Sequence, residues 1–297
     1  MMRDFSRDHR WLSINTATVR QSRGAALPLP DIIEACARRG IRAISPWRDQ
    51  VAAAGLDVVG KLVDSHGLEL SGYCRGGMFP AADAKGLAAA REDNRRAVDE
   101  ACTLGAACLV LVVGGLPGAL AGHAVHKDIA LARSQVRDGM AELLEYARAA
   151  GMPLAIEPLH PMYAADRACI NTMEQALDLC DELDGSEADT ERAALGIAVD
   201  VYHVWWDPKL KSQIERAGRQ RLLAFHVCDW LTPTADLLND RGMMGDGVIE
   251  IPRIRSWVEA QGYAGYSEVE IFSANDWWRR GHDEVLDTCI ARHRSAV

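Results

Sequence analysis

The sequence predicts an α/β fold, a single (β/α)8 TIM barrel that spans residues 1–297 as one domain. Eight short β-type runs alternate with helical segments, and no stretch between them resembles a domain linker. No Gly-x-Gly-x-x-Gly turn follows the first strand, which disfavours the runner-up, a doubly wound open sheet. A chain of 297 residues with 48% hydrophobic residues also supplies a sizeable core.

The predicted strands are brief apolar runs, several of them rich in β-branched residues that favour β structure. In chain order they cover residues 11–16, 41–45, 68–73, 108–113, 153–157, 195–200, 222–226 and 266–271. The run 108–113 is nearly all apolar, which is typical of a parallel strand covered on both faces. This pattern indicates a parallel sheet enclosed by helices.

Helix signals fall between these runs. The predicted helices begin or end near residues 28–40, 49–66, 91–104, 128–150, 171–183, 208–218, 251–262 and 282–292. Gly67 and Gly151 are suited to close two of them. Asn171 and Glu174 have the spacing of a capping box with Asn171 as the cap, and the Gly-rich segment 74–80 is predicted to be a loop.

Composition and charge exclude several classes of protein. The formal net charge of -9 and the absence of a basic stripe argue against binding to nucleic acid. The charged N-terminal segment lacks the apolar stretch of a signal peptide and no later run is long enough to cross a membrane, so we expect a cytoplasmic protein. Eight cysteines occur without a Cys-x-x-Cys pair, and most are expected to be buried small residues.

Four of the predicted strands share one unusual feature, a polar residue at the C-terminal end of an apolar run. These residues are Glu157, Asp200, His226 and Glu270, on predicted strands five to eight. Burying an ionised carboxylate is costly unless a cation or hydrogen-bond donors meet it, so four such ends suggest one shared partner. A divalent metal ion is the simplest partner, at the end of the barrel where such enzymes build their sites.

The composition of this set indicates which metal it would bind. Three carboxylates and one imidazole suit one Mn²⁺ ion best, with Mg²⁺ or Co²⁺ as alternatives, in octahedral geometry. Glu268 complicates the set, because residues two apart on a strand face the same way. We favour Glu270 as the ligand because it lies nearer the C-terminal end of the strand.

The order Glu157, Asp200-x-x-His203, Phe225-His226 and Glu270-Ile-Phe272 resembles the xylose-isomerase-like TIM barrels. The resemblance is to the sugar isomerase/epimerase group, which includes ketose 3-epimerases, hydroxypyruvate isomerase and inosose dehydratases, and it spans nearly the whole chain. It implies that all four strand-end residues bind one metal and that Glu157 and Glu270 also transfer protons. It further implies that His203 contacts a substrate hydroxyl, and it makes Arg241 the nearest counterpart of an arginine that follows the metal-binding histidine in the epimerases.

Loop residues beside these positions supply further candidates. His160, three residues after Glu157, is predicted to be a catalytic acid or base, and Asp229 after His226 to bind substrate. Arg75, in a Gly-rich segment, has the chemistry to bind a carboxylate or phosphate. Trp47 is one of six tryptophans near strand ends, and an indole face stacks well on the C–H face of a sugar.

The leading functional hypothesis is a metal-dependent isomerase or epimerase that removes a proton next to the ketone of a keto-sugar or keto-cyclitol, through an enediolate. The alternative is a lyase on the same scaffold, either inosose dehydratase-like or the catalytic subunit of an enzyme that eliminates from a 3-keto-glycoside, a C-glycoside deglycosidase. An endonuclease is disfavoured by the charge, and a binding subunit without catalysis stays open. The expected partner is a small sugar or cyclitol, in a homo-oligomer or a hetero-oligomer.

Overall fold

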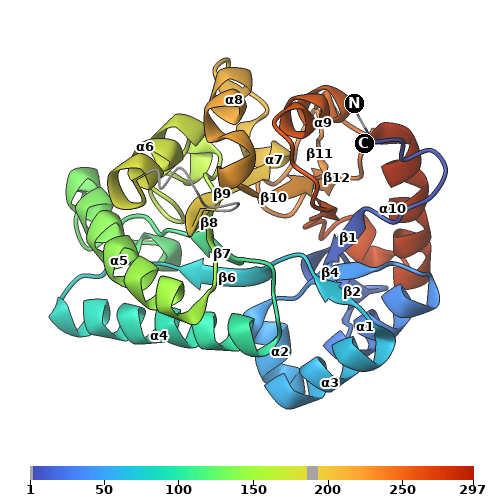
Figure 1. Cartoon of the computed structure of the whole chain (residues 1–297), viewed down its shortest axis with the longest axis horizontal. Coiled ribbons are helices and arrows are strands. Elements are labelled where there is room, and N and C mark those ends of the chain that lie inside the picture. Colours follow the sequence, from blue (N-terminus) through green and yellow to red (C-terminus); the bar gives the residue numbers. More distant parts are fainter. Residues whose placement is uncertain (1–2, 186–192) are drawn as a thin grey trace.

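Nine parallel strands form a nearly closed barrel surrounded by helices in this computed structural model, which describes residues 3–185 and 193–297 (Figure 1). The strand order around the barrel is β5-β4-β1-β13-β10-β9-β8-β7-β6. The strands are β1 (Leu12–Asn15), β4 (Ala43–Ser45), β5 (Glu69–Leu70), β6 (Tyr73–Gly77), β7 (Leu109–Val112), β8 (Leu154–Ile156), β9 (Leu195–Asp200), β10 (Leu222–Val227) and β13 (Ser267–Val269). The predicted (β/α)8 barrel is confirmed, with its third strand divided into β5 and β6.

The division of the third strand explains why the barrel has nine strands. Only Ser71 and Gly72 separate β5 from β6. The carbonyl of Leu70 accepts a hydrogen bond from the backbone of Ala107 at 2.9 Å, and the N–H of Cys74 donates to Pro46 at 3.0 Å. Strand β5, which pairs with β4, thus also bonds to the residue two before β7, and β6, which pairs with β7, also bonds to the residue after β4. These two hydrogen bonds close the ring.

The helices that cover the barrel are α1 (Leu29–Arg38), α2 (Arg48–Ala54), α3 (Leu56–His66), α4 (Ala84–Thr103), α5 (Ile129–Ala150), α6 (Met173–Leu183), α7 (Val201–Val204), α8 (Leu210–Arg221), α9 (Ile251–Ala260) and α10 (His282–Ala296). The single helix predicted for 49–66 is in fact two, because Gly55 adopts φ 93 and ends α2. The capping prediction is off by one residue, since the Thr172 side chain accepts from Gln175 while Asn171 holds the preceding loop.

Short elements complete the chain at the loops. They are the 3-10 turns η1 (Thr16–Val19), η2 (Ala119–Ala121), η3 (Pro161–Tyr163) and η4 (Trp277–Arg279), and the two-stranded pairs β2 (Gln21–Ser22) with β3 (Ala25–Ala26) and β11 (Asp229–Trp230) with β12 (Arg241–Gly242). Among residues 3–185 and 193–297, no helix is both long and apolar enough to cross a membrane.

Two layers of apolar packing hold the barrel together. The larger layer lies between strands and helices, and a smaller cluster occupies the barrel interior. The interior cluster consists of Cys74, Cys108, Val110, Ala155, Ala198, Leu223 and Ala224. Seven of the eight cysteines are buried, which confirms their expected role as small core residues.

The register of the parallel strands gathers the polar strand ends at one rim. His226 on β10 pairs with Asp200 on β9 and, on its other side, with Glu268 on β13. The N–H of Glu270 donates to Val227 at 3.2 Å, which places Glu270 one step beyond the end of β13. Because all strands run in the same direction, their C-terminal side chains face a common space.

Candidate metal centre

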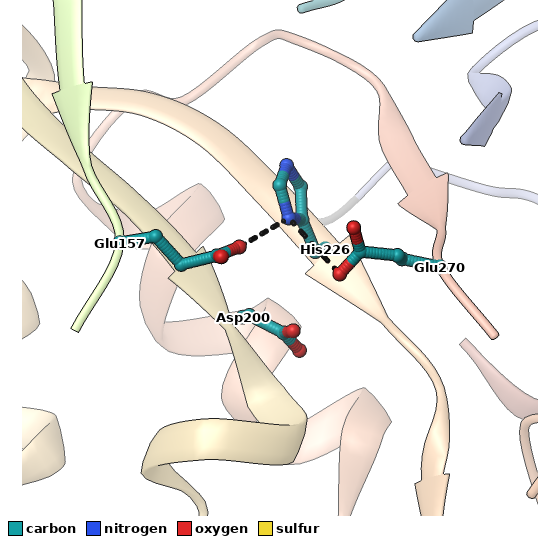
Figure 2. Close-up of side chains that lie close together, drawn as sticks. All are labelled: Glu157, Asp200, His226 and Glu270. Carbon is teal, nitrogen blue, oxygen red and sulfur yellow. Dashed lines mark hydrogen bonds and ion pairs between the residues drawn. The ribbon is translucent and has the colours of Figure 1, made fainter. Parts of the chain in front are cut away.

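Four polar side chains converge at the C-terminal rim of the barrel (Figure 2). Glu157 follows β8, Asp200 ends β9, His226 lies on β10 and Glu270 follows β13. All four are buried, and one potential ligand atom from each lies within 4.8 Å of all the others. The structure therefore brings together the four residues that the sequence predicts as metal ligands.

The distances within this cluster fit a single cation. His226 Nδ1 lies 2.9 Å from Glu157 Oε1 and 3.9 Å from Glu270 Oε2. Ligands on opposite sides of an ion with bonds of about 2.1 Å would be roughly 4.2 Å apart, and adjacent ligands about 3 Å apart. Small adjustments of the side chains would give the coordination distances.

The charges of the cluster call for a cation. Burial raises the pKa of Asp200 to about 6 although Arg241 opposes the shift. Burial and then the charge of Glu157 raise the pKa of Glu270. Two of the three buried carboxylates in the cluster share one guanidinium, since Arg241 Nη1 lies 3.0 Å from both Asp200 Oδ2 and Glu270 Oε2. A divalent ion would balance the two charges that Arg241 leaves.

His226 presents one ring nitrogen to the cluster and the other to Glu268. Its Nε2 lies 3.4 Å from Glu268 Oε1 and makes no hydrogen bond within the described residues. Burial opposes protonation of His226, but the charge of Glu268 and the hydrogen bond with Glu157 raise its pKa well above the ordinary value. A metal ion at Nδ1 would displace that proton and leave an Nε2–H facing Glu268.

Glu268 is held in this supporting position by two donors. Asn15 Nδ2 donates to Glu268 Oε1 at 2.9 Å, and Ser71 Oγ donates to Glu268 Oε2 at 2.7 Å. Asn15 Nδ2 also lies 3.0 Å from Glu270 Oε1. The choice that the sequence leaves open is thus resolved geometrically, with Glu270 in the cluster and Glu268 behind the imidazole ring.

A cavity with about 480 Å³ of empty space opens beside the cluster. We call it the strand-end cavity. It is lined by Trp47, Arg75, Met78, Val112, Leu120, Glu157, Leu159, Tyr163, Arg167, His203, Leu238, Arg241, Glu270 and Phe272. A second hollow, at the opposite end of the strands, includes Trp11, Phe225 and Tyr266 but none of the four cluster residues. The strand-end cavity is therefore the space in which a substrate would meet the cluster.

His203 and Arg241, both predicted to bind substrate, contact each other in this cavity. His203 Nε2 lies 3.2 Å from Arg241 Nη2 and 3.6 Å from Asp200 Oδ2. Burial and then the charge of Arg241 lower the pKa of His203 well below its ordinary value, so its ring is neutral. The Arg241 guanidinium also lies over the rings of Tyr202 and Phe272, at 4.4 and 5.0 Å from the centroids.

His160, predicted to be catalytic, does not line the strand-end cavity. Its ring packs on Trp230 and Trp206, with centroid distances of 4.9 and 5.8 Å, and burial lowers its pKa. Its backbone N–H donates to His203 Nδ1 at 3.2 Å. Within the described residues, His160 thus reaches the cavity lining through its backbone bond to His203, while its ring packs on tryptophans.

Asp229, predicted to bind substrate, is also placed away from the cavity. Its Oδ1 accepts the N–H groups of Trp230 and Ile249 and its Oδ2 accepts that of Gly245, each at 2.9 Å. The side chain is fully buried. Its oxygens hold Trp230 of β11 and the loop that follows β12, where pairing satisfies buried N–H groups that would be costly to leave unpaired.

The sequence prediction misses three features of the site: Arg167 in the cavity lining, Asn15 beside the cluster, and the position of Glu268 behind the His226 ring. Asn15 ends β1, so the strand-end rule that selects the other residues would have found it. Its Oδ1 accepts from Trp47 Nε1 at 2.7 Å and so fixes the one strand-end tryptophan that lines the cavity. Arg167 lies in an irregular loop, where no periodic pattern indicates its direction.

Comparisons with known proteins bear on the family and the fold. Residues 33–289 match the sequence profile described as "Xylose isomerase-like TIM barrel". The inosose isomerase of Halalkalibacterium halodurans is 24% identical over 152 residues, 50% of this chain and 49% of that protein, so the match spans about half the length of this relative.

Two solved structures are similar over most of the chain. Protein SMc04130 from Sinorhizobium meliloti 1021 is 56% identical with a TM-score of 0.89, and the match covers 96% of this chain and 98% of that one. The IolI protein, solved with a zinc atom, is 19% identical with a TM-score of 0.75 and 94% of each chain covered, which shows a shared fold. Together with the profile match, these similarities establish that the chain belongs to the xylose isomerase-like TIM barrel family.

Proposed function

We propose that this protein is a divalent-metal-dependent isomerase or epimerase that acts on a keto-sugar or keto-cyclitol. The observation that carries the proposal is the convergence of Glu157, Asp200, His226 and Glu270 beside a cavity that Glu157 and Glu270 also line. The resemblance of part of the chain to an inosose isomerase supports the same reaction class. We propose Mn²⁺ as the ion, because three carboxylates outnumber the single imidazole.

A divalent ion held by these four residues would stabilise, by several kcal/mol, the charge that develops on a substrate ketone and its neighbouring hydroxyl. Glu157 and Glu270 come from strands β8 and β13, which lie apart in the barrel order, and both reach the cavity. One carboxylate takes the proton next to the ketone, and the other returns a proton to that carbon or its neighbour. General acid–base catalysis of this kind contributes roughly 10² to 10⁴-fold.

His203 and Arg241 supply the binding groups in this proposal. The neutral His203 ring and the Arg241 guanidinium lie 3.2 Å apart and both line the cavity. Their positions suit hydrogen bonds to substrate oxygens near the cluster. Trp47, fixed by Asn15, offers an apolar wall to the C–H face of the substrate.

Solvent exchange tests the reaction directly. The Mn²⁺-loaded protein would be incubated in deuterated water with a panel of keto-sugars and inososes, and products followed by NMR and mass spectrometry. We expect deuterium at the carbon next to the ketone without loss of water. E157Q and E270Q should each lower the exchange rate at least about 100-fold, since each removes a proton-transfer group.

The control is E174Q, because Glu174 pairs with Lys209 on the surface. Metal content of each variant would be measured alongside, so that loss of the ion is separated from loss of proton transfer. A dehydrated or eliminated product would replace the isomerase proposal with the lyase alternative. Absence of exchange with every ketone would contradict both.

A further inference from the structure

Arg75 is directed by an irregularity in strand β6. Cys74 pairs with Val110 on β7 and Gly76 pairs with Leu111, so Arg75 is an extra residue without a partner in the register. Such a β-bulge changes the direction of a side chain and is common beside active sites. The half-buried Arg75 side chain lines the strand-end cavity.

The backbone that carries this bulge is clamped from outside the barrel. Asn94, a buried residue of α4, accepts the N–H of Gly77 at 2.6 Å and donates to the carbonyl of Gly77 at 2.8 Å. Gly77 adopts φ 107, and a Cβ there would lie 2.0 Å from the carbonyl oxygen of Val112. The segment that presents Arg75 is thus fixed in place before a substrate arrives.

Arg75 has no anionic partner within the described residues. No hydrogen bond or ion pair joins its guanidinium to another side chain in residues 3–185 and 193–297. Burial and then the charge of Arg167 lower the pKa of Arg75, and they outweigh the opposing charge of Glu157. A partly buried guanidinium without a partner is costly, so its retention in a cavity wall needs a reason.

Arg167 lines the same cavity, and the positive charge of its guanidinium is also poorly balanced by nearby carboxylates. Its Nε is buried without a hydrogen-bond partner, and its nearest carboxylate oxygen, on Asp166, lies 3.9 Å away. Its guanidinium carbon lies 5.8 Å from the centroid of the Tyr163 ring, and its backbone N–H donates to the Tyr163 carbonyl at 3.1 Å. Two arginines therefore face one cavity, Arg75 from strand β6 and Arg167 from the loop that follows η3.

A divalent ion bound in the cluster would leave this pair uncompensated. The three carboxylates Glu157, Asp200 and Glu270 would then balance Arg241 and the ion. Glu268 lies behind the His226 ring and does not line the cavity. Arg75 and Arg167 then remain as positive charges that face the substrate space.

We propose that Arg75 and Arg167 bind an oxyanion carried by the substrate, so that the substrate is an acidic ketose or keto-cyclitol with a carboxylate or a phosphate. The planar guanidinium fork matches either group. This inference rests on the proposed function, because it names the substrate class of the same cavity. It also separates this chain from an enzyme of neutral sugars.

Three ketoses with one skeleton test the charge requirement: D-fructose, D-fructuronate and D-fructose 6-phosphate. Binding to the Mn²⁺-loaded protein would be measured by isothermal titration calorimetry. We expect at least one of the two anionic ketoses to bind about 10-fold or more tightly than fructose. R75Q and R167Q should each weaken that binding by roughly 10- to 100-fold, and more than they weaken binding of fructose, because each removes a charge-assisted hydrogen bond.

The control variant is R91Q, since Arg91 pairs with Glu142 on the surface. R75K and R167K keep the charge without the planar fork and should show an intermediate loss. Tighter binding of fructuronate than of the phosphate ester identifies a carboxylate as the group, and the reverse order identifies a phosphate. Equal affinity for all three ketoses, absence of binding included, overturns the proposal, as does an anion preference that both glutamine variants retain.

The calorimetric result is independent of the exchange experiment. An anion preference that depends on Arg75 and Arg167, without any deuterium exchange, supports the arginine site and contradicts the proposed reaction. Deuterium exchange with the neutral ketose at the same kcat/KM as with the anionic ones supports the reaction and overturns the arginine proposal.

Discussion

The two ring nitrogens of His226 meet two different neighbours. Nδ1 faces Glu157 in the cluster, while Nε2 faces Glu268 at 3.4 Å. A carboxylate behind a metal-binding histidine orients the ring and raises the basicity of the coordinating nitrogen. Glu268 is itself oriented by Asn15 and Ser71, so the support extends to strand β1 and to the break in the third strand.

At the scale of single residues, we predict that E268Q weakens Mn²⁺ binding by about 10-fold. A neutral amide raises the basicity of the His226 imidazole less than a carboxylate does. Calorimetric titration of Mn²⁺ into the metal-free variant and the wild type measures the change. E174Q serves as the control for loss of one surface carboxylate. Unchanged affinity in E268Q would assign Glu268 a purely structural role.

Residue-level prediction from sequence succeeds where a polar side chain breaks an apolar pattern. Glu157, Asp200, His226 and Glu270 all end apolar strands, and the structure brings them together. Asp229 follows the same run as His226, yet its oxygens bind three backbone N–H groups. The sequence does not reveal that difference, because the N–H groups of Gly245 and Ile249 approach from a loop whose path it leaves open.

At the scale of elements, the Gly-rich segment 74–80 shows where propensity misleads. Glycine is depleted in strands, so the sequence predicts a loop, whereas β6 continues to Gly77. Asn94 lies 17 residues further along the chain and compensates by binding both polar groups of Gly77. A tertiary contact of this kind overrides local preference, and it also fixes the backbone that directs Arg75 into the cavity where the sequence predicts a substrate-binding residue.

Helix α10 packs on the N-terminal segment through His293. The ring of His293 is fully buried and stacks on Phe5 with a centroid distance of 4.4 Å, and both of its nitrogens lack hydrogen-bond partners. Burial and then the charge of Arg255 lower the pKa of His293 to about 3. The Arg255 guanidinium lies over the Phe5 ring and binds the carbonyls of Arg3 and Val297, so one side chain joins both ends of the described chain.

We predict that His293 makes the protein less stable in acid. Between about pH 6.5 and pH 3 the unfolded chain binds a proton at this histidine and the folded chain does not, so the free energy of unfolding falls as pH falls. The loss is about 2 kcal/mol between pH 6.5 and pH 5. H293F keeps the stacked ring without the titration.

Urea unfolding of wild type and H293F at pH 7.5 and pH 5 measures this effect. The wild type should lose about 2 kcal/mol more than the variant between the two pH values. H282F is the matched control, because His282 is only partly buried and begins the same helix. Equal losses in wild type and H293F would show that His293 does not couple folding to protons.

For the whole molecule, the proposed metal site would link stability to metal binding through its buried carboxylates. The alternation of β-type and helical runs is sufficient to predict the barrel, because a parallel strand requires a crossover helix. The ninth strand is not predictable in this way. The break at Ser71 and Gly72 depends on how β4 and β7 divide the third strand between them, which is a tertiary contact. The rim where the strands end then concentrates negative charge that one ion would relieve.

We predict that Mn²⁺ at 100 times its dissociation constant raises the free energy of unfolding by about 2.7 kcal/mol over the EDTA-treated protein. D200N should abolish most of this gain. The gain should also shrink as pH falls through about 6, because protons then compete for Asp200, whose pKa is raised to about 6. Thermal and urea unfolding with Mn²⁺ and with EDTA, at pH 7.5 and pH 5, measures this gain in wild type and D200N. Identical unfolding curves with Mn²⁺ and with EDTA would contradict the prediction.

The hydrogen bonds of Asp229 allow the length of residues 231–240 to vary among homologues. Arg241 returns to the cavity after ten intervening residues that follow Trp230, and Trp230 pairs with Arg241 across the β11 and β12 hairpin. Because Asp229 anchors the backbone on both sides of that excursion, insertions and deletions within residues 231–240 can accumulate without displacing the guanidinium. Homologues should therefore vary in length here while they keep an aspartate and an arginine at its two ends.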